Sequence, residues 1–119
     1  MTSLEKAKAV VKVMNDKKGK DIKLIEIGEL SSLGDYFVIA SAASTTQVKA
    51  ISDDIEDEMT KLGYEPNRVD GRQTAQWILM DYYDVMVHVF QDESRNFYNL
   101  ERLWADAPTV DISDLLTRD

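Results

Sequence analysis

The chain has 119 residues, of which 44% are hydrophobic, and it carries a formal net charge of −8. This length and apolar content predict one small globular domain rather than a disordered chain. The absence of cysteine excludes disulfides, thiolate zinc sites and a cysteine nucleophile, and a single histidine excludes a two-histidine metal site within one chain. The acidic balance disfavours a free-standing nucleic-acid binder, because neutralising phosphates requires clustered lysine and arginine.

The N-terminal segment does not have the pattern of a targeting sequence. Glu5 and several lysines interrupt any apolar stretch within residues 1–21, so a secretory signal peptide is not predicted. The same segment lacks the Arg- and Ser-rich composition of an organelle transit peptide. No apolar run approaches the roughly 20 residues needed to cross a bilayer. We therefore expect a cytoplasmic protein of bacterial type with no membrane partner.

The first third of the chain predicts a helix and two strands. Apolar residues recur at helical spacing over residues 3–17, which indicates an amphipathic helix ending near Gly19. Residues 22–27 and 36–40 have the composition of strands. The segment Gly28–Gly34 between them is rich in turn residues and is interpreted as a loop.

A second helix is predicted after the sequence STTQ at residues 44–47. The serine hydroxyl and the glutamine amide of this capping box can satisfy each other's backbone N–H groups, and Gly63 ends the helix. Five acidic residues crowd the helix surface: Asp53, Asp54, Glu56, Asp57 and Glu58. We interpret them as a solvated face rather than a cation site, because metal ligands must converge from several directions.

The second half of the chain predicts three more strands. The first covers residues 66–71 and is placed at a sheet edge, because Pro66 cannot donate a hydrogen bond to a neighbouring strand. The next two cover residues 77–82 and 84–90 and are joined by a tight connection around Tyr83. Together with the earlier pair, they predict a sheet of about five strands.

A broken helix and an acidic tail complete the chain. Residues 92–107 are predicted to form a short helix, interrupted near Asn99 and stopped by Pro108. Residues 109–119 lack a clear apolar face, so we expect a mobile or partner-dependent tail after a single domain at 1–108. The order α-β-β-α-β-β-β-α predicts an α/β (α+β) fold, a mixed β-sheet with flanking helices.

The single histidine, His88, shares one face of its predicted strand with Met86 and Phe90. A catalytic base would need a carboxylate to orient the ring and a nucleophile within reach. The sequence contains no Gly-x-Ser-x-Gly elbow and no second histidine. We therefore favour a packed, hydrogen-bonded histidine over a catalytic one.

Asp35, Asp81 and Asp84 are the carboxylates that an acid–base or two-metal site could use. Asp81 and Asp84 flank the predicted strand connection, where short polar residues commonly serve turns. A nucleotidyl transferase would show Gly-Ser followed by closely spaced aspartates, whereas Asp35 follows Gly34 and leads into aromatic residues. The chain also has no glycine-rich phosphate loop, and we predict no catalytic residue, no metal and no cofactor.

Trp77 begins a strand with two different faces. Trp77, Leu79 and Asp81 share one face, and Ile78, Met80 and Tyr82 share the other. If the second face covers the core, the first presents an aromatic anchor beside a charge, which is typical of interface hot spots. A Trp77 that only fills the core is an equally good reading of the sequence.

Four segments of the chain follow a recognisable pattern. They are DYFVIASAASTTQVKAI (Asp35–Ile51), GYEPNRVDG (Gly63–Gly71), WILMDYYDVMVHVF (Trp77–Phe90) and FYNLERLWADAP (Phe97–Pro108). In this order and spacing they resemble the ribosomal silencing factor family, also called the Iojap-like family. The resemblance covers residues 4–110, and four separate motifs make it far more specific than any single short pattern.

The resemblance implies a role without catalysis. Members of this family bind the large ribosomal subunit through its L-fourteen protein, on the face that meets the small subunit. The bound factor sterically blocks joining of the subunits, which lowers translation when nutrients or energy are scarce. The resemblance also implies a homodimer in the free state and a fold similar to that of nucleotidyl transferases without their catalytic aspartates.

Carried onto this chain, the partner-contacting surface centres on the strand pair that begins at Trp77, with the ERLW segment as a second matching motif. The residues assigned to partner binding are Trp77, Leu79, Asp81, Tyr82, Glu101, Arg102 and Trp104. One position departs from the expected pattern. Tyr83 stands where a glycine-like tight turn is expected in relatives, which leaves the hairpin geometry open.

Three functions follow from the sequence, and an anti-association factor is favoured. Net acidity suits docking on a basic ribosomal protein and implies little direct contact with nucleic acid. The first alternative is a nucleotidyl transferase-like enzyme with its carboxylates relocated to Asp35, Asp81 and Asp84. The second is a generic dimeric adaptor that binds a partner other than the ribosome.

Overall fold

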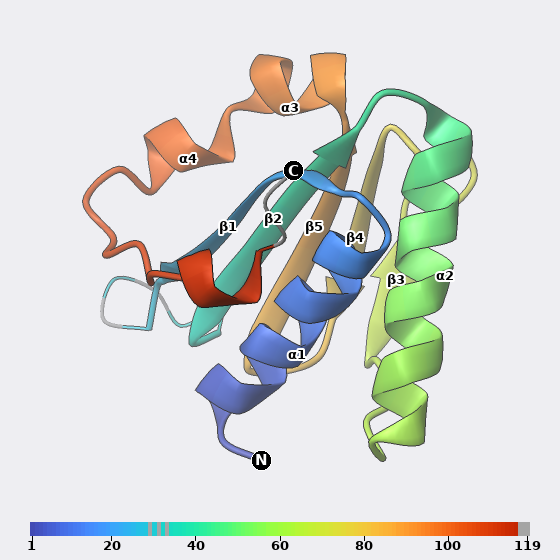
Figure 1. Ribbon diagram of the computed structural model, residues 1–119. Coiled ribbons are helices and arrows are strands. Elements are labelled where there is room, and N and C mark those ends of the chain that lie inside the picture. Colours follow the sequence, from blue (N-terminus) through green and yellow to red (C-terminus); the bar gives the residue numbers. More distant parts are fainter. Residues whose placement is uncertain (29, 31, 33, 117–119) are drawn as a thin grey trace.

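Helices and strands follow the predicted order along the chain in a computed structural model (Figure 1), with the last helix divided in two. The structure describes residues 1–28, 30, 32 and 34–116. The predicted loop Gly28–Gly34 therefore lies partly outside the described residues. The elements are α1 (Ser3–Asp16), β1 (Lys20–Glu26), β2 (Tyr36–Ala42), α2 (Thr45–Lys61), β3 (Arg68–Asp70), β4 (Trp77–Asp81), β5 (Val85–Gln91), α3 (Asp92–Tyr98), α4 (Leu100–Leu103) and the 3-10 helix η1 (Ser113–Leu115).

The strands form one five-stranded sheet in the order β1-β2-β5-β4-β3. The central pair, β2 and β5, is parallel, and the other neighbours are antiparallel. The two central strands are almost entirely buried, which explains their near-continuous apolar sequences. The predicted mixed sheet with flanking helices, an α+β fold, is thereby confirmed.

Helices α1 and α2 cover one face of the sheet (Figure 1). The hydroxyl of Thr2 accepts a hydrogen bond from the Glu5 N–H at 3.1 Å, and the Glu5 carboxylate accepts one from the Thr2 N–H at 3.0 Å, so a capping box starts α1. At α2, Ser44 Oγ accepts from the Gln47 N–H at 3.2 Å, which confirms the predicted serine cap. The first core lies between these helices and the sheet; its buried members include Val10, Met14, Val38, Ile51, Ile55, Met80, Tyr82 and Val87.

A second, smaller core lies on the opposite sheet face. Its buried members are Ile25, Ile27, Phe37, Ile39, Phe90, Leu100 and Ala107. Leu100 of α4 and Ala107 of the turn after it are the last two, and α3 contacts β5 and β2. Asn99, between the helices, has a left-handed φ of 48°, and the predicted break near Asn99 is confirmed.

A tight turn joins β4 to β5 and does not contain glycine. Tyr83 has a φ of 71°, and the N–H of Asp84 donates to the C=O of Tyr82 at 2.9 Å, as in a three-residue γ-turn. The carboxylate of Asp81 accepts from the Tyr83 N–H at 2.8 Å and supports the turn. The hairpin therefore closes with a tyrosine in a conformation that usually favours glycine.

The segment after Pro108 runs along the free edge of β1. The N–H of Glu26 donates to the C=O of Pro108 at 2.9 Å, and the N–H of Val110 donates to the C=O of Leu24 at 2.8 Å. The side chains that pack against the first core are Val110, Ile112, Leu115 and Leu116. Residues 109–116 are therefore packed on the domain, whereas a mobile tail was expected. They are held because they cover the open edge of β1 and apolar side chains of the first core. The domain boundary after residue 108 stays a prediction.

The acidic face of α2 is largely occupied by ion pairs. Arg72 lies 2.6 Å from Asp53 and also contacts Glu56. Lys17 and Lys61 pair with two further acids of the helix, Asp54 and Glu58. None of the helices in the described part of the chain is both long and apolar enough to span a membrane.

Candidate functional site

The sheet face opposite α1 and α2 is left open along β4. Alternation along β4 buries Ile78 and Met80 in the first core and leaves Trp77 and Leu79 half-buried on the opposite face. Helix α3 contacts β5 and β2, and Trp104 after α4 packs on Phe37 of β2, but Trp77 and Leu79 of β4 are left half-buried. Apolar side chains therefore reach solvent on one side of the sheet.

Trp77 is held in place from three directions. Its indole N–H donates to Nδ1 of His88 at 3.1 Å. Its ring stacks on Phe90, with 5.0 Å between centroids, and contacts the ring of Tyr98 at 4.8 Å. The half-buried indole is thus neither a sealed core residue nor a free side chain. It is an oriented aromatic group with one accessible side.

His88 supports this tryptophan from inside the protein. Its ring is 4% exposed, and its edge-to-face contact with Phe37 has a centroid distance of 4.6 Å. Since Nδ1 accepts the indole N–H, the proton of the neutral ring lies on Nε2, which is sealed without a partner among the described residues. Burial lowers the pKa of His88 to about 3. The packed, hydrogen-bonded histidine is confirmed.

Two exposed aromatic residues extend the open face. Phe97 and Tyr98, at the end of α3, are 74% and 53% exposed, and their rings contact each other at 5.2 Å. Tyr98 in turn contacts Trp77. We call the group the aromatic surface, and its members are Trp77, Leu79, Met86, Phe97 and Tyr98.

Tyr82 is a correction to the predicted site. It is 1% exposed and belongs to the first core, with its hydroxyl sealed without a partner among the described residues. Burial raises the pKa of this hydroxyl, and Glu56 and Glu65 add to the effect. The physical reason is strand alternation, which points Tyr82 to the face opposite Trp77. A partner docked on the aromatic surface could not reach its side chain.

Four other residues of the predicted site each lie in a different setting. Asp81 is half-buried, and its carboxylate serves the hairpin turn and accepts from the Asn67 amide at 3.3 Å. Glu101 faces inward and binds Arg95 Nε at 3.0 Å. Arg102 is exposed. Trp104 is half-buried against Phe37, with a centroid distance of 5.3 Å in an edge-to-face contact.

The carboxylates considered for an enzyme do not all meet. Asp35 and Asp84 share the Ser3 hydroxyl, which lies 2.8 Å from the first and 2.6 Å from the second. Lys6 Nζ lies 2.6 Å from the other Asp84 oxygen, whereas Asp81 is engaged in the hairpin turn. Partial burial opposes ionisation of Asp84, but the hydrogen bonds from Lys6 and Ser3 outweigh it and lower the pKa of Asp84. This cluster links the start of α1 to the residues that precede β2 and β5.

Replacing Lys6 by methionine tests the contribution of the Lys6–Asp84 ion pair to stability. In the wild type, the lowered pKa of Asp84 contributes stability that is present above the unfolded-state pKa of 3.8 and is lost as the pH falls through the folded-state value. We expect Lys6→Met to lower the unfolding free energy at pH 7 by about 1–2 kcal/mol and to reduce the loss on acidification. Urea unfolding at several pH values measures both. The exposed Lys49→Met variant on α2 is the control, and equal effects in both would contradict the assignment.

Comparison with known proteins was decisive for the family. The whole chain, residues 1–119, matches a family described as "RsfS: Ribosomal silencing factor during starvation". The chain belongs to the ribosomal silencing factor family. Family membership was predicted from the four motifs and is confirmed. The role of this family is regulatory rather than catalytic.

Relatives within the family match most of the chain. A protein of Bacillus subtilis named ribosomal silencing factor RsfS is 40% identical over 98 residues, which are 82% of this chain and 83% of the relative. One of the same name from Halalkalibacterium halodurans is 35% identical over 117 residues, 98% of this chain and all of the relative. A crystal structure of a Chromobacterium violaceum protein superposes with a TM-score of 0.86 at 31% identity, covering 88% of both chains.

Within this family member, sequence reasoning missed three residues of the aromatic surface. Phe97 and Tyr98 lie in a motif that resembles the family, but were not assigned to the site, and Met86 was treated only as a neighbour of His88. Two adjacent aromatic residues in a short polar helix were the available signal. A helix as short as α3 has one narrow buried face, so it cannot bury both of two adjacent aromatic rings.

Proposed function

We propose that this protein lowers translation under nutrient limitation by binding the large ribosomal subunit, through its L-fourteen protein, and sterically blocking the small subunit from joining. The observation that carries the proposal is the aromatic surface, left uncovered on one sheet face of a ribosomal silencing factor family member. The protein acts in the cytoplasm, where it occupies space and catalyses no reaction.

The composition of the aromatic surface suits a protein partner. Tryptophan, tyrosine, phenylalanine and methionine are enriched where protein interfaces are fully desolvated. Trp77 is already oriented by its hydrogen bond to His88, so little conformational freedom is lost when a partner covers it. Asp81, the last residue of β4, and the exposed Arg102 supply charged groups for the contact.

Net charge favours a basic partner protein over direct contact with RNA. At −8, the chain as a whole repels phosphate and attracts a lysine- and arginine-rich surface. Ribosomal proteins that bind RNA present such surfaces, and complementary charge accelerates docking on them. Direct contacts with nucleic acid are therefore few.

The free protein forms a homodimer. An uncovered aromatic surface is costly in water, and a second copy of the chain can cover it until the ribosome is available. Sedimentation of the free protein measures this state. A dimer that uses the aromatic surface would compete with ribosome binding.

A subunit-joining assay tests the proposed function directly. Purified small and large subunits are mixed under joining conditions with increasing amounts of the protein and separated on a sucrose gradient. The joined ribosome peak is expected to fall, with the protein co-sedimenting with the large subunit alone. Unchanged joining at saturating protein would refute steric exclusion.

Phe97→Ala is the variant that separates docking from folding. Because Phe97 is 74% exposed, its removal should change the unfolding free energy by no more than about 0.5 kcal/mol. We expect co-sedimentation with large subunits to weaken about tenfold or more, as for an interface anchor. Leu62→Ala, at the far end of α2 and 47% exposed, is the control and should bind like the wild type. Equal binding by both variants would exclude Phe97 from the interface.

A further inference from the structure

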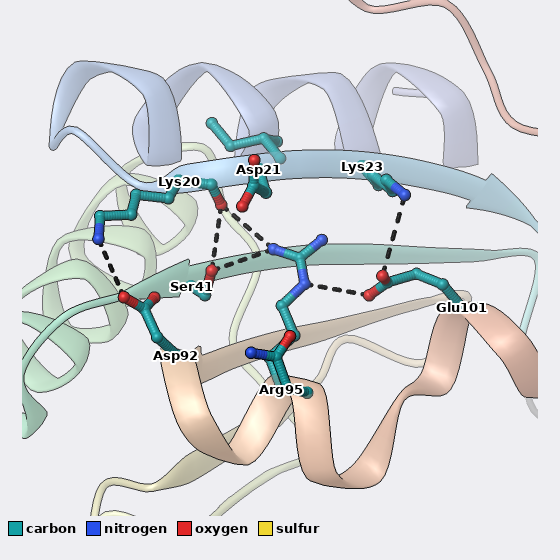
Figure 2. Close-up of a pocket in the computed structure, with 9 residues that line it drawn as sticks. Lys20, Asp21, Lys23, Ser41, Asp92, Arg95 and Glu101 are labelled. Atoms are coloured by element: carbon teal, nitrogen blue, oxygen red, sulfur yellow. Dashed lines mark hydrogen bonds and ion pairs between the residues drawn. The ribbon is translucent and has the colours of Figure 1, made fainter.

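A polar pocket separate from the aromatic surface lies between the start of β1 and helices α3 and α4 (Figure 2). Its volume is about 600 Å³, and β1, β2, α3 and α4 all contribute to its walls. Most of its polar residues come from positions far apart in the sequence and meet only in the folded chain. None of the residues of the aromatic surface lines this pocket.

An irregularity in β1 shapes one wall of the pocket. Lys20 pairs with Ser41 and Lys23 with Ile39, so β1 carries one residue more than β2 between these pairs. This is a β-bulge, and Asp21 within it has a left-handed φ of 49°. Bulges redirect side chains, and a non-glycine residue in this conformation costs of the order of 1–3 kcal/mol. Here the redirected side chain is the Asp21 carboxylate, which lines the pocket.

A buried arginine forms the floor of the pocket. Arg95 is 6% exposed; its Nε donates to Glu101 at 3.0 Å, and its Nη1 donates to Ser41 Oγ at 3.1 Å and to the C=O of Lys20 at 3.2 Å. The second terminal nitrogen, Nη2, has no hydrogen-bond partner among the described residues and is not sealed from solvent. Figure 2 shows it pointing toward β1, between Asp21 and Lys23.

The other charges of the pocket are already paired. Lys20 lies 2.9 Å from Asp92, and Lys23 lies 3.8 Å from Glu101. Among the described lining residues, the Asp21 carboxylate forms no ion pair, and the Nη2 of Arg95 has no hydrogen-bond partner. A simple anion would meet the carboxylate, and a simple cation would meet the guanidinium. A ligand with both charges satisfies both groups.

We propose that this pocket binds a free α-amino acid as its zwitterion. The ligand carboxylate accepts hydrogen bonds from Arg95 Nη2, and the ligand ammonium group donates to the Asp21 carboxylate. Arg95 is fixed by its three protein bonds, so the binding geometry is preorganised. The side chain of the ligand lies in the remaining volume, toward Ile22 and Asn96.

Amide NMR of the isotope-labelled protein tests the proposal. Each of the twenty L-amino acids is added at millimolar concentration, and the shifts of residues 20–23 and of the Arg95 side chain are followed. At least one amino acid is expected to produce saturable shifts confined to the pocket. Its methyl ester, which lacks the carboxylate, and its N-acetyl form, which lacks the ammonium group, should each bind at least about tenfold more weakly. Absence of saturable shifts across the panel, or equal binding of the blocked forms, would overturn the proposal.

Asp21→Asn supplies the matched variant. Asparagine tolerates a left-handed backbone, so the bulge is retained while the charge is lost. Amino-acid affinity is expected to fall about tenfold or more, because a charged hydrogen bond to the ammonium group is removed. Asp57→Asn, on the exposed face of α2, makes the same charge change outside the pocket and should leave affinity unchanged. Unaltered binding by Asp21→Asn would refute the assignment. Because binding is measured without ribosomes, this outcome is independent of the docking function.

Discussion

As the pH falls from 6.5 to 3, we expect the unfolding free energy of the wild type to decrease more steeply than that of a His88→Asn variant. The difference between the two slopes should be about 1.4 kcal/mol per pH unit. His88 is buried between the aromatic rings of the sheet face, and burial lowers its folded-state pKa to about 3 from an ordinary 6.5. The protein therefore keeps a neutral imidazole at pH values where an unfolded chain takes up a proton.

The direction of the effect follows from where the proton binds. Well above pH 6.5 neither state is protonated at His88, and the stability contributed by the neutral ring is fully present. As the pH falls below 6.5, the unfolded state binds a proton at His88 and the folded state does not, so unfolding is favoured. Below about pH 3 the folded state is protonated as well, and the extra slope disappears.

Asparagine is the appropriate replacement because its side-chain oxygen can take the position of Nδ1 and accept the Trp77 indole N–H. Urea unfolding at half-unit pH steps gives the two curves. Asp84 and the other carboxylates titrate in both proteins, so their contribution cancels in the difference. Parallel curves would show that His88 is protonated in the folded protein and that the burial argument is wrong.

Periodicity predicted most of the elements, because each depends on residues close together in the sequence. The spacing of apolar residues gave both long helices to within a few residues, and the STTQ sequence located the Ser44 cap. Residue alternation also predicted that Trp77 and Ile78 face opposite sides of the sheet. What alternation could not predict was the exposure of Trp77, which depends on how far α3 and α4 extend across the second face.

The error at Tyr82 has a different origin. The family resemblance placed Tyr82 on the partner surface together with Trp77, Leu79 and Asp81, but a strand presents only every second residue to one side. The alternation that separates Trp77 from Ile78 already placed Tyr82 on the Ile78 side, and the family assignment was kept against it. Tyr83 follows in the turn, where the alternation ends, and its ring is 67% exposed.

The contacts of Arg95 lay beyond sequence reasoning altogether. Its guanidinium contacts a carboxylate of α4, six residues away, and also a backbone carbonyl of β1 and a hydroxyl of β2, which are distant in the chain. No spacing rule connects such positions. The β-bulge that turns the Asp21 side chain likewise arises from the pairing of β1 with β2. Its left-handed residue is an aspartate rather than a glycine, so the sequence gives no sign of the bulge.

Trp77→Ala is expected to abolish co-sedimentation with large ribosomal subunits and to lower the unfolding free energy by about 2 kcal/mol. The loss of stability is below the 3–5 kcal/mol typical of a fully buried tryptophan, because one side of this indole faces solvent. It arises from the lost stacking on Phe90, the lost ring contact with Tyr98 and the His88 nitrogen left without its donor.

Tyr64→Ala is the control for destabilisation. Tyr64 is also a half-buried aromatic residue, but it packs against the first core on the α1 side, where its ring lies 4.6 Å from Lys6 Nζ. Its removal should lower stability by a similar amount and leave ribosome binding intact. Measuring both variants well below their unfolding midpoints keeps each protein folded during the assay.

Trp77→Phe separates the ring from its hydrogen bond. Phenylalanine retains an aromatic face on Phe90 but cannot donate to His88, so the side chain is less firmly oriented. We expect binding intermediate between the wild type and Trp77→Ala, because an anchor that must be ordered on docking binds more weakly than one already held in place. If Tyr64→Ala loses binding as completely as Trp77→Ala, the loss reflects destabilisation, and the open sheet face is not the ribosome-binding surface.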